Sequence, residues 1–525
     1  MVVKRDEFLD EEYLWNKAKQ GGGDVTTEGI SITANGRYVA PSGRAYTPVV
    51  VSVDPFFAEP KDVQFIDYDG TILYSYTPQE FAQLTELPSN PTHEGLTAQG
   101  WNWPLAEAKL YVASYGKLII GQMYITDDGK TRLYITLEDP WLSPYLGLAV
   151  NGTAVIDWGD GTSRDTVTGV STSSSDLIST PHTYSNPGAY VVTIDIIGAA
   201  AICGSNTDKS YSRFLWNNKT VLPEQNTCYA STITDIRMGS NIFFIGSSFY
   251  SCTNLQSINI PFGITGLGNY LFGKCSSLKA VVIPNGVSSF SGSSNGFSTC
   301  YNLSKVALPN DITKIPNYFF YNCSSLASVF VPSQVTAIGN NAFYGCSALK
   351  DLVLPNSITS INSYAFYNCY AIQRFSFPSS FSGTSIASYE FYNCKSLLKI
   401  DIPDGVTMIY ERAFYGCNNL QRVSIPDGVT KISSNAFYSC PNLYKIVLPS
   451  TLTNIAELSF YNCFSLKEIH FQGTTPPTVA NANAWTNLLT DCTIYVPYSE
   501  DHSVLNAYKT AANYPNPNTY TYVEE

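Results

Sequence analysis

Two acidic motifs in the first third of the chain have the residue types and spacing that phosphoryl transfer needs. The segment FIDYDGTIL places Asp67 and Asp69 two residues apart, and TDDGKT (126–131) supplies a second acidic pair. In this arrangement Asp67 would accept the phosphoryl group and Asp69 would act as acid and base, while a lysine such as Lys109 would hold the phosphate charge. The spacing therefore raises phosphatase chemistry as a hypothesis.

The sequence around the two acidic motifs does not predict the helices and strands that would have to position these carboxylates. The DxDGT motif resembles the nucleophile loop of haloacid-dehalogenase-type phosphatases, which need a doubly wound parallel sheet of well over about 100 residues. The two motifs lie too close together for that sheet, and Pro88, Pro91 and Pro104 interrupt the segment between them. Asp-Gly at Asp69 and Asp128, between alternating apolar residues, predicts hairpin turns instead. Because no GxSxG, HExxH or P-loop motif occurs either, we expect no enzyme and keep the phosphatase only as a second alternative.

Thirteen cysteines are the other candidates for chemistry, as metal ligands or disulfide partners. Ten of them recur at steps of 23 or 25 residues between Cys252 and Cys463. Zinc sites need close cysteine pairs together with histidine, and the chain has only four histidines. Sulfurs one repeat apart would be separated by a whole strand spacing, which is too far for comfortable disulfide geometry. We therefore interpret the column as small buried thiols and expect no metal and no cofactor.

The cysteine period is one column of a longer repeat. Phe stands three residues before each of the ten cysteines, Leu or Ile stands three after, and apolar residues stand six and eight after. This alternation predicts a strand with two inward side chains. In nine of the ten copies a proline stands nine residues after the cysteine, and it should end the strand. A second pair of inward apolar side chains is expected twelve and fifteen residues after each cysteine. The Phe and Cys columns should form a structural ladder, represented by Phe343, Cys346, Phe366, Cys369, Phe414, Cys417, Phe437 and Cys440.

We expect each repeat to form one coil of a solenoid. One coil cannot bury its apolar side alone, so stacked coils must share a core. The pattern AFYxCxxLxxVxIPxxVTxI resembles the BspA-like, Treponema-type leucine-rich repeat, over about residues 228–472. The resemblance implies a leucine-rich repeat solenoid within a mainly β, multidomain chain. We expect an N-terminal attachment helix and glycine linker (1–23), a β-hairpin module (24–56), a small α+β module (57–130), a PKD-like β-sandwich (131–200), a solenoid N-terminal cap (201–248), ten leucine-rich repeats (249–472) and a C-terminal cap (473–525).

Two segments before the repeats resemble known modules. VIDWGDGTS and HTYSNPGAYVVTIDI are similar to the turn and strand pair of the polycystic-kidney-disease (PKD) type, an Ig-like β-sandwich that serves as a spacer or adhesion module. Asp157 and Asp160 in its turn are candidates for calcium, with turn stabilisation as the commoner role. Residues 29–53 and 61–130 resemble modules of tail-associated proteins from phages and prophages of gut Firmicutes.

Composition and the N-terminal residues limit the partners. Thirty Lys plus Arg against 42 Asp plus Glu give a net charge of -12, which would repel a phosphate backbone, so nucleic acid is not expected. The first residues carry charges where a signal peptide needs an apolar core, and no segment reaches the roughly 18 apolar residues of a membrane span. We therefore expect neither a signal peptide nor membrane insertion.

A row of residues five and seven positions after the cysteines should face away from the core, because positions six and eight face inward. Its cations and an apolar pair are our candidate receptor contacts: Lys305, Phe330, Val353, Arg374, Lys399, Arg422 and Lys445. Such a row fits an anionic cell-wall polymer, although a solvent-exposed sheet face also carries long polar side chains without binding anything. The tyrosine that follows the Phe in most repeats leaves the same choice open, between stacking on sugars and a half-buried structural ladder.

The favoured function is a non-catalytic adhesin, or receptor-binding structural protein, of a phage tail. In that virion the N-terminal segment would dock to other tail proteins and the solenoid would contact a bacterial surface polymer or protein. The alternative is an extracellular BspA-like adhesin on the bacterial cell surface that binds a host protein or glycan. The missing signal peptide favours the virion, and formation of a homo-oligomer stays open.

The hairpin interpretation of Asp67 can be tested directly. We expect no magnesium-dependent hydrolysis of p-nitrophenyl phosphate above the buffer rate, because a hairpin turn does not assemble a phosphate site. Release of nitrophenolate is followed by absorbance for the parent chain and for Asp67→Asn. Hydrolysis by the parent that Asp67→Asn abolishes would contradict the non-enzyme interpretation.

Overall fold

The computed structural model divides the chain into two compact units, residues 1–60 and 61–525. It describes residues 61–138, 142–173, 176–202, 215–216, 228–246, 249–287, 290 and 295–525, together with the strand residues of the first unit. Those strands form an antiparallel sheet in chain order: β1 (Val25–Thr27), β2 (Ile30–Ile32), β3 (Tyr38–Val39) and β4 (Ala45–Tyr46). The pairing of β2 to β4 agrees with the hairpin predicted within residues 29–53. The predicted helix at 1–20 and its glycine linker lie outside the described residues.

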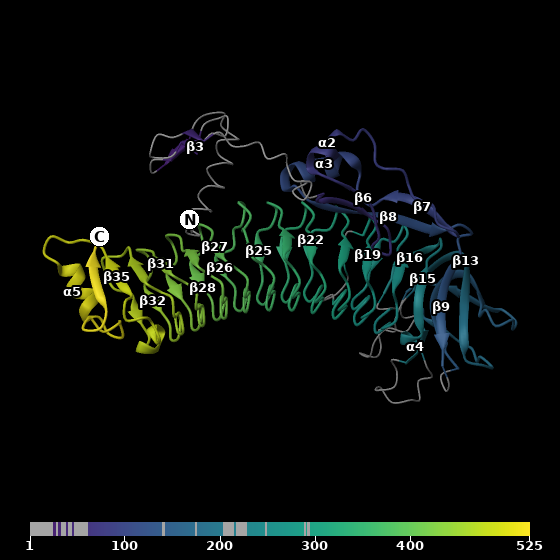
Figure 1. The fold of residues 1–525 in the computed structure, drawn as a ribbon. Helices are drawn as coiled ribbons and strands as arrows, with labels where there is room; N and C mark the ends of the chain where they lie inside the picture. Colours follow the sequence, from purple (N-terminus) through teal and green to yellow (C-terminus); the bar gives the residue numbers. More distant parts are fainter. Residues whose placement is uncertain are drawn as a thin grey trace. The chain divides into compact units, whose positions relative to one another are not determined.

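The repeats build a solenoid in which most coils contribute two short parallel strands, as Figure 1 shows. The first ladder follows the cysteines and contains β15 (Ile233–Arg237), β17 (Ser257–Asn259), β19 (Ala280–Val282), β20 (Lys305–Ala307), β22 (Ser328–Phe330), β24 (Asp351–Val353), β27 (Lys399–Asp401), β29 (Arg422–Ser424), β31 (Lys445–Leu448) and β33 (Glu468–Phe471). The second contains β16 (Ile242–Ile245), β18 (Gly266–Leu267), β21 (Lys314–Ile315), β23 (Ala337–Ile338), β25 (Ser360–Ile361), β26 (Ser385–Ile386), β28 (Met408–Ile409), β30 (Lys431–Ile432), β32 (Asn454–Ile455) and β34 (Thr478–Val479). The predicted inward positions are buried, for example Val329, Val331, Val335 and Ile338 at 0% exposure.

The phenylalanine column is a continuous stack through the core. Rings of consecutive coils lie nearly parallel, with centroids 5.2 to 5.7 Å apart from Phe249 to Phe460. Trp485 in η4 (Ala482–Trp485) continues the stack at 5.1 Å from Phe460. The column therefore ends on a ring of the C-terminal cap that the repeat pattern did not reveal.

The cysteine column has a hydrogen-bonding role besides its small size. Each thiol from Cys275 to Cys463 donates to the carbonyl of the phenylalanine one coil earlier, at Sγ to oxygen distances of 2.9 to 3.3 Å. The residue before each of the ten ladder cysteines has positive φ, as at Asn322 and Asn368 (+56° and +58°), a conformation that Asn and Gly adopt readily. Thiol donation to a buried carbonyl explains why the column is cysteine rather than alanine.

Residues 61–126 form the α+β module: β5 (Val63–Ile66), β6 (Ile72–Tyr76), α2 (Pro78–Gln83), β7 (Leu96–Trp101), α3 (Leu105–Tyr115) and β8 (Leu118–Thr126). The sheet order is β6-β5-β8-β7, with only β5 and β8 parallel. The hairpin predicted at Asp69 is confirmed, since β5 and β6 pair antiparallel across it and the Asp67 N–H donates to the Thr71 carbonyl. At Asp128 the turn is present, but the hairpin prediction is wrong, because β8 and β9 pair with other strands.

The α+β module packs on the first strand ladder of the solenoid. Its core includes Val282, Ala307 and Phe330 from three successive coils. A Cβ at Gly121 of β8 would lie 2.4 Å from Val282 Cγ2, so the side chain of Val282 occupies the space that any side chain at this position would need. Polar groups at the contact are also paired: Trp103 Nε1 donates to the Leu308 carbonyl at 2.9 Å, and the Tyr111 hydroxyl donates to the Val331 carbonyl at 2.8 Å. The module is thus part of one folded unit with the solenoid.

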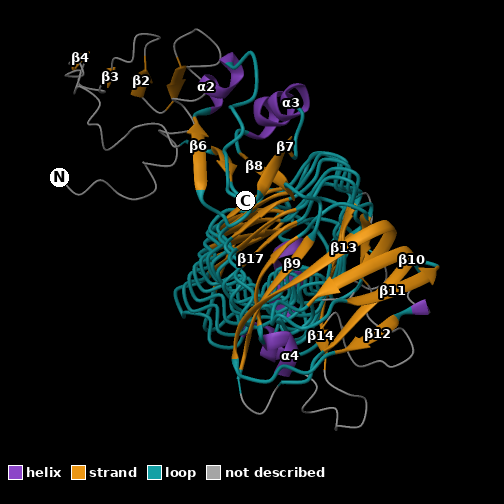
Figure 2. Ribbon diagram, turned by 90° about the vertical axis from the view of Figure 1, so that its right-hand side faces the viewer, coloured by secondary structure: helices purple, strands orange, loops and turns teal. Residues whose placement is uncertain are grey.

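The region expected as a separate β-sandwich is joined to the first coils. It contains β9 (Thr131–Leu137), β10 (Tyr145–Asp157), β11 (Asp165–Val170), β12 (Ile178–Pro181) and β13 (Gly188–Ile202), and β14 (Leu215–Trp216) and α4 (Cys228–Ser231) follow in the segment expected as the N-terminal cap. Strand β9 pairs with β15 and strand β13 with β16, so one sheet continues into both ladders. Figure 2 shows this sheet across the end of the stacked coils. It closes the N-terminal end of the core, while β15 and β16, expected as the cap, form a first coil.

The C-terminal end is closed as the sequence suggested. Strands β35 (Thr493–Val496) and β36 (Thr521–Glu524) extend the first ladder in parallel, and α5 (Ser503–Thr510) buries Tyr508 against the core. The C-terminal Glu525 lies beside His470, at 2.5 Å between Oε1 and Nδ1. Among the described residues no helix is long and apolar enough to cross a membrane.

The buried ladder predicts free thiols. Unreduced protein unfolded in guanidinium should react with close to thirteen equivalents of thiol reagent, one per cysteine. The native protein should react far more slowly, because burial raises the pKa of the ladder thiols, to about 12 for Cys463, and the thiolate is the reactive form. Fewer than about four equivalents after unfolding would indicate disulfides and contradict the ladder.

Close packing of the α+β module on the solenoid predicts that Gly121→Ala destabilises the protein. Overpacking against Val282 should lower the free energy of unfolding by about 1–3 kcal/mol, measured by chemical denaturation. The same change in a Val282→Ala background is the control and should cost less, because two methyl groups have been removed from the contact. An equal cost in both backgrounds would contradict the packing of β8 on β19.

Candidate binding surface

The seven predicted receptor contacts lie on the first ladder, but they divide into two groups with different surroundings. Lys305, Phe330 and Val353 lie on β20, β22 and β24, under or beside the α+β module. Arg374, Lys399, Arg422 and Lys445 lie on later coils that the module does not cover. The sequence placed all seven on one exposed face, and the structure brings only the second group together there.

The expectation that the first group faces solvent is wrong for Phe330, while Lys305 and Val353 are half-buried. Phe330 is only 8% exposed, and Val353 packs against the same core cluster of the module. Lys305 Nζ donates to the Gly70 carbonyl at 2.8 Å. Partial burial lowers the pKa of this ammonium group, and the nearby Asp69 raises it by a smaller amount. A signal was present in the sequence: the seventh position after the cysteine is apolar from Val282 to Val353 but polar in the next three coils.

The remaining residues define the open strand face, the outward side of the ladder in the four coils after β24. Its members are Arg374, Ser376, Lys399, Asp401, Arg422, Ser424, Lys445 and Val447, all exposed or half-buried. The four cations occupy equivalent positions: Arg374 pairs with Lys399, Lys399 with Arg422, and Arg422 with Lys445. Adjacent parallel strands lie about 4.8 Å apart, so the cations form the close row that the repeat predicted.

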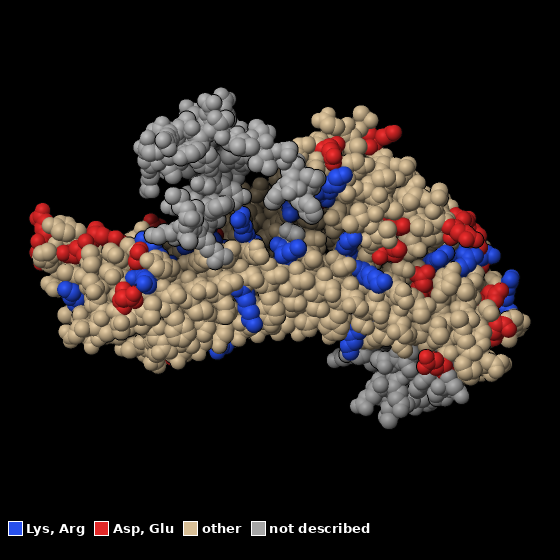
Figure 3. Space-filling view, in the orientation of Figure 1, with Lys and Arg blue, Asp and Glu red and all other residues tan. Residues whose placement is uncertain are grey.

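Part of this positive charge is balanced within the chain. Lys399 Nζ lies 3.0 Å from Asp401, and Lys445 Nζ lies 3.0 Å from Glu468. His470 and Lys445 together lower the pKa of Glu468, so that carboxyl is ionised at neutral pH. Arg422 makes no ion pair with any residue that the structure describes. Charged side chains are sparse on the solenoid surface in view in Figure 3. The open strand face therefore combines a row of four cations with hydroxyl groups from two serines.

The tyrosine column does not offer free ring faces between its ends. Consecutive rings are stacked with centroids 4.4 to 4.8 Å apart, in the series Tyr321, Tyr344, Tyr367, Tyr392, Tyr415, Tyr438 and Tyr461. Each inner ring is covered on both sides by its neighbours, and all seven side chains are half-buried. This geometry supports the structural ladder over stacking on sugars.

The two calcium candidates stabilise a turn. Asp157 accepts from the Gly159 N–H and pairs with Arg164 at 3.0 Å. Asp160 accepts from the Thr162 N–H and hydroxyl, and its other oxygen lies 2.8 Å from His182 Nε2. Both carboxylates thus have the local partners expected of turn residues.

Comparison with known proteins identifies the repeat. The family described as "BspA type Leucine rich repeat region" matches residues 217–295, 291–385 and 384–494, more than half of the chain. A leucine-rich repeat protein from Bacteroides ovatus is 24% identical, covering 56% of this chain and 82% of its own, with a TM-score of 0.42. A leucine rich cell surface protein from Faecalibacterium prausnitzii is 28% identical, covering 46% and 78%, with a TM-score of 0.31. The T. pallidum leucine rich repeat protein is 29% identical, covering 36% and 77%, with a TM-score of 0.28. No curated protein matches the sequence.

The matched residues contain the coils whose Phe and Cys columns, inward strand positions and two ladders are described above. The repeat that the residue spacing predicts is therefore the repeat that the family model matches. This chain belongs to the BspA-type leucine-rich repeat family.

Proposed function

We propose that this chain is a non-catalytic binding protein of the bacterial cell surface whose open strand face holds an anionic partner. The observation that carries the proposal is the row of four cations on neighbouring coils, left uncovered where the α+β module ends. Lys399 and Lys445 pair with Asp401 and Glu468, while Arg422 makes no ion pair with a described residue. The partner is a carboxylate- or phosphate-bearing polymer or an acidic patch of a host protein.

The row favours binding for a physical reason. Like charges held about 4.8 Å apart repel one another, and the folded solenoid cannot separate them. An anion that lies along the row relieves this repulsion, and several weak contacts add up because the partner is a single molecule. The ion pairs of Lys399 and Lys445 are at the surface, where such pairs contribute little and can be exchanged for contacts to a ligand.

The surface location is preferred to the phage-tail location that the N-terminal resemblance suggested. Family membership rests on the repeat, and the F. prausnitzii relative is described as a cell surface protein. No relative named above is described as a virion protein. The attachment helix that the virion hypothesis also accounted for lies outside the described residues.

We also assign residues 131–202 the role of a PKD-type domain used as an end cap. Its WGDG turn is supported by Trp158, whose Nε1 donates to Asp165 at 2.7 Å and whose ring stacks on His182 at 4.5 Å. Pairing of β9 and β13 with the first coil supports a fixed cap rather than a flexible spacer.

Replacing Arg374, Lys399, Arg422 and Lys445 together by Ser tests the site. Binding to immobilised dextran sulfate, measured by surface plasmon resonance, should weaken at least tenfold relative to the parent. Parent binding should also fall steeply as salt rises above ~0.15 M, where screening acts over about 8 Å. Folding should be kept, because all four side chains reach solvent and surface changes usually alter stability by about 0.5 kcal/mol or less.

A matched variant controls for net charge. Lys314, Lys395, Lys431 and Lys509 lie off the strand face, and their replacement by Ser removes the same charge. This control should bind dextran sulfate within about twofold of the parent, since screening confines the attraction to nearby charges. Equal binding by the two quadruple variants would show that the open strand face is not the site.

A further inference from the structure

A pocket of about 660 Å³ lies where the α+β module meets the sheet of β9 and β15. This junction pocket is lined by residues from four separate segments, including Tyr68, Glu94, Asp127, Arg132 and Arg237. Its volume is in the range of small-molecule sites, about 300–1,000 Å³. The pocket is remote in sequence from the open strand face and uses none of its residues.

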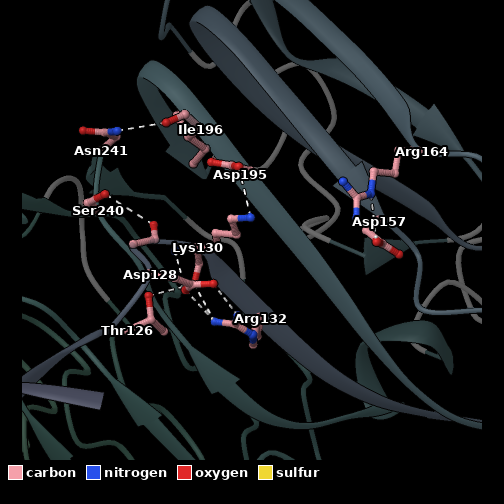
Figure 4. A network of polar contacts seen from close by, with 11 residues as sticks. Thr126, Asp128, Lys130, Arg132, Asp157, Arg164, Asp195, Ile196, Ser240 and Asn241 are labelled. Atoms are coloured by element: carbon pink, nitrogen blue, oxygen red, sulfur yellow. Dashed lines mark hydrogen bonds and ion pairs between the residues drawn. The ribbon is translucent and has the colours of Figure 1, made fainter. Parts of the chain in front are cut away.

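The polar side chains of the junction pocket are held in place before any ligand arrives. Arg132 donates from two nitrogens to the two oxygens of Asp128, at 2.9 and 2.6 Å, as Figure 4 shows. This contact lowers the pKa of Asp128 to about 2, so the pair is ionised at neutral pH. Asp127 Oδ1 accepts from the Thr97 hydroxyl at 2.5 Å, and Arg237 donates to the Glu94 carbonyl at 3.3 Å.

The aromatic part of the wall is also fixed. Tyr68 packs edge to face against His93 and Tyr124, with centroids 5.8 and 5.5 Å away. His93 is in turn held by the buried Asp67, at 2.7 Å between Nε2 and Oδ2. The aspartate of the DxDGT motif therefore positions an aromatic wall of the pocket through His93.

The charges define which ligand class fits. Two guanidinium groups face three carboxylates, Glu94, Asp127 and Asp128, so the pocket has no excess positive charge for an anion. Charged groups on the wall also disfavour an apolar ligand, which would bury them without hydrogen bonds. A sugar ring meets both conditions: its hydroxyls donate to carboxylates and accept from guanidinium groups, while its C–H face packs on an aromatic ring.

We propose that the junction pocket binds one neutral hexopyranose residue of a surface glycan. Arg132 and Asp128 hydrogen-bond neighbouring hydroxyls as a pair, and Tyr68 contacts the apolar face of the ring. This second site is independent of the proposed strand-face function and adds recognition of a neutral sugar to recognition of an anion.

Saturation-transfer difference NMR with the full chain tests the proposal. The probes are the methyl glycosides of glucose, galactose, mannose and N-acetylglucosamine. At least one should receive saturation on its ring protons. Its affinity should fall at least tenfold in Arg132→Ala and stay within about twofold of the parent in Arg164→Ala. Arg164 is the matched control, because it also pairs with an aspartate, Asp157, at 3.0 Å and does not line the pocket.

A second variant keeps the test decisive if Arg132→Ala unfolds. Glu94 is exposed at the pocket wall, and its contact to Arg237 uses only the backbone carbonyl. Glu94→Trp should therefore fill the pocket without removing that hydrogen bond, and it should abolish the transfer. Absence of transfer to all four glycosides would overturn the proposal, as would transfer that survives in Glu94→Trp.

Discussion

Burial of the apolar side of each coil depends on the coils beside it, and the rest of the architecture follows from this constraint. A coil contributes one Phe, one Cys and a few aliphatic side chains, and these leave water only when a neighbouring coil covers them. Stacked Phe rings and thiols that donate to carbonyls of the preceding coil make that covering regular. The register is fixed by directional contacts as well as by apolar area, and it holds the outward side chains in straight columns.

The same constraint acts at both ends, where no further coil is present. At the C-terminal end, Trp485 stacks on Phe460 and Tyr508 covers the last apolar layer. At the other end, strands β9 and β13 pair with the first coil and share its core. Residues 131–202, which resemble a separate module, therefore share the hydrophobic core of the solenoid. Their sheet is joined to the first coil through its strand pairing.

One part of the outward side of the first ladder packs against the α+β module, and the other part is exposed to solvent. The α+β module covers this side as far as Val353, and the coils that follow present Arg374 and its neighbours to solvent. A row of like charges would be costly under the module, where burial already lowers the pKa of Lys305. The apolar residues lie where the module packs and the cations lie beyond it. Docking of the module also creates the junction pocket, because Arg237 and Tyr68 meet only when the two parts are in contact.

The sequence by itself determined the repeat, the inward positions and the free-thiol ladder, because each is a local pattern copied ten times. It also predicted the hairpin at Asp69 and the row from Arg374 to Lys445. Only the tertiary structure decided that Phe330 is buried, that β8 and β9 join different sheets, and that Asp67 supports a pocket. These outcomes depend on single contacts between distant segments, such as the Asn102 amide with the Ile283 carbonyl. Contacts of this kind do not repeat along the sequence, so a pattern of residue types does not predict them. The one sign of them in the sequence is that the seventh position after the cysteine is apolar from Val282 to Val353.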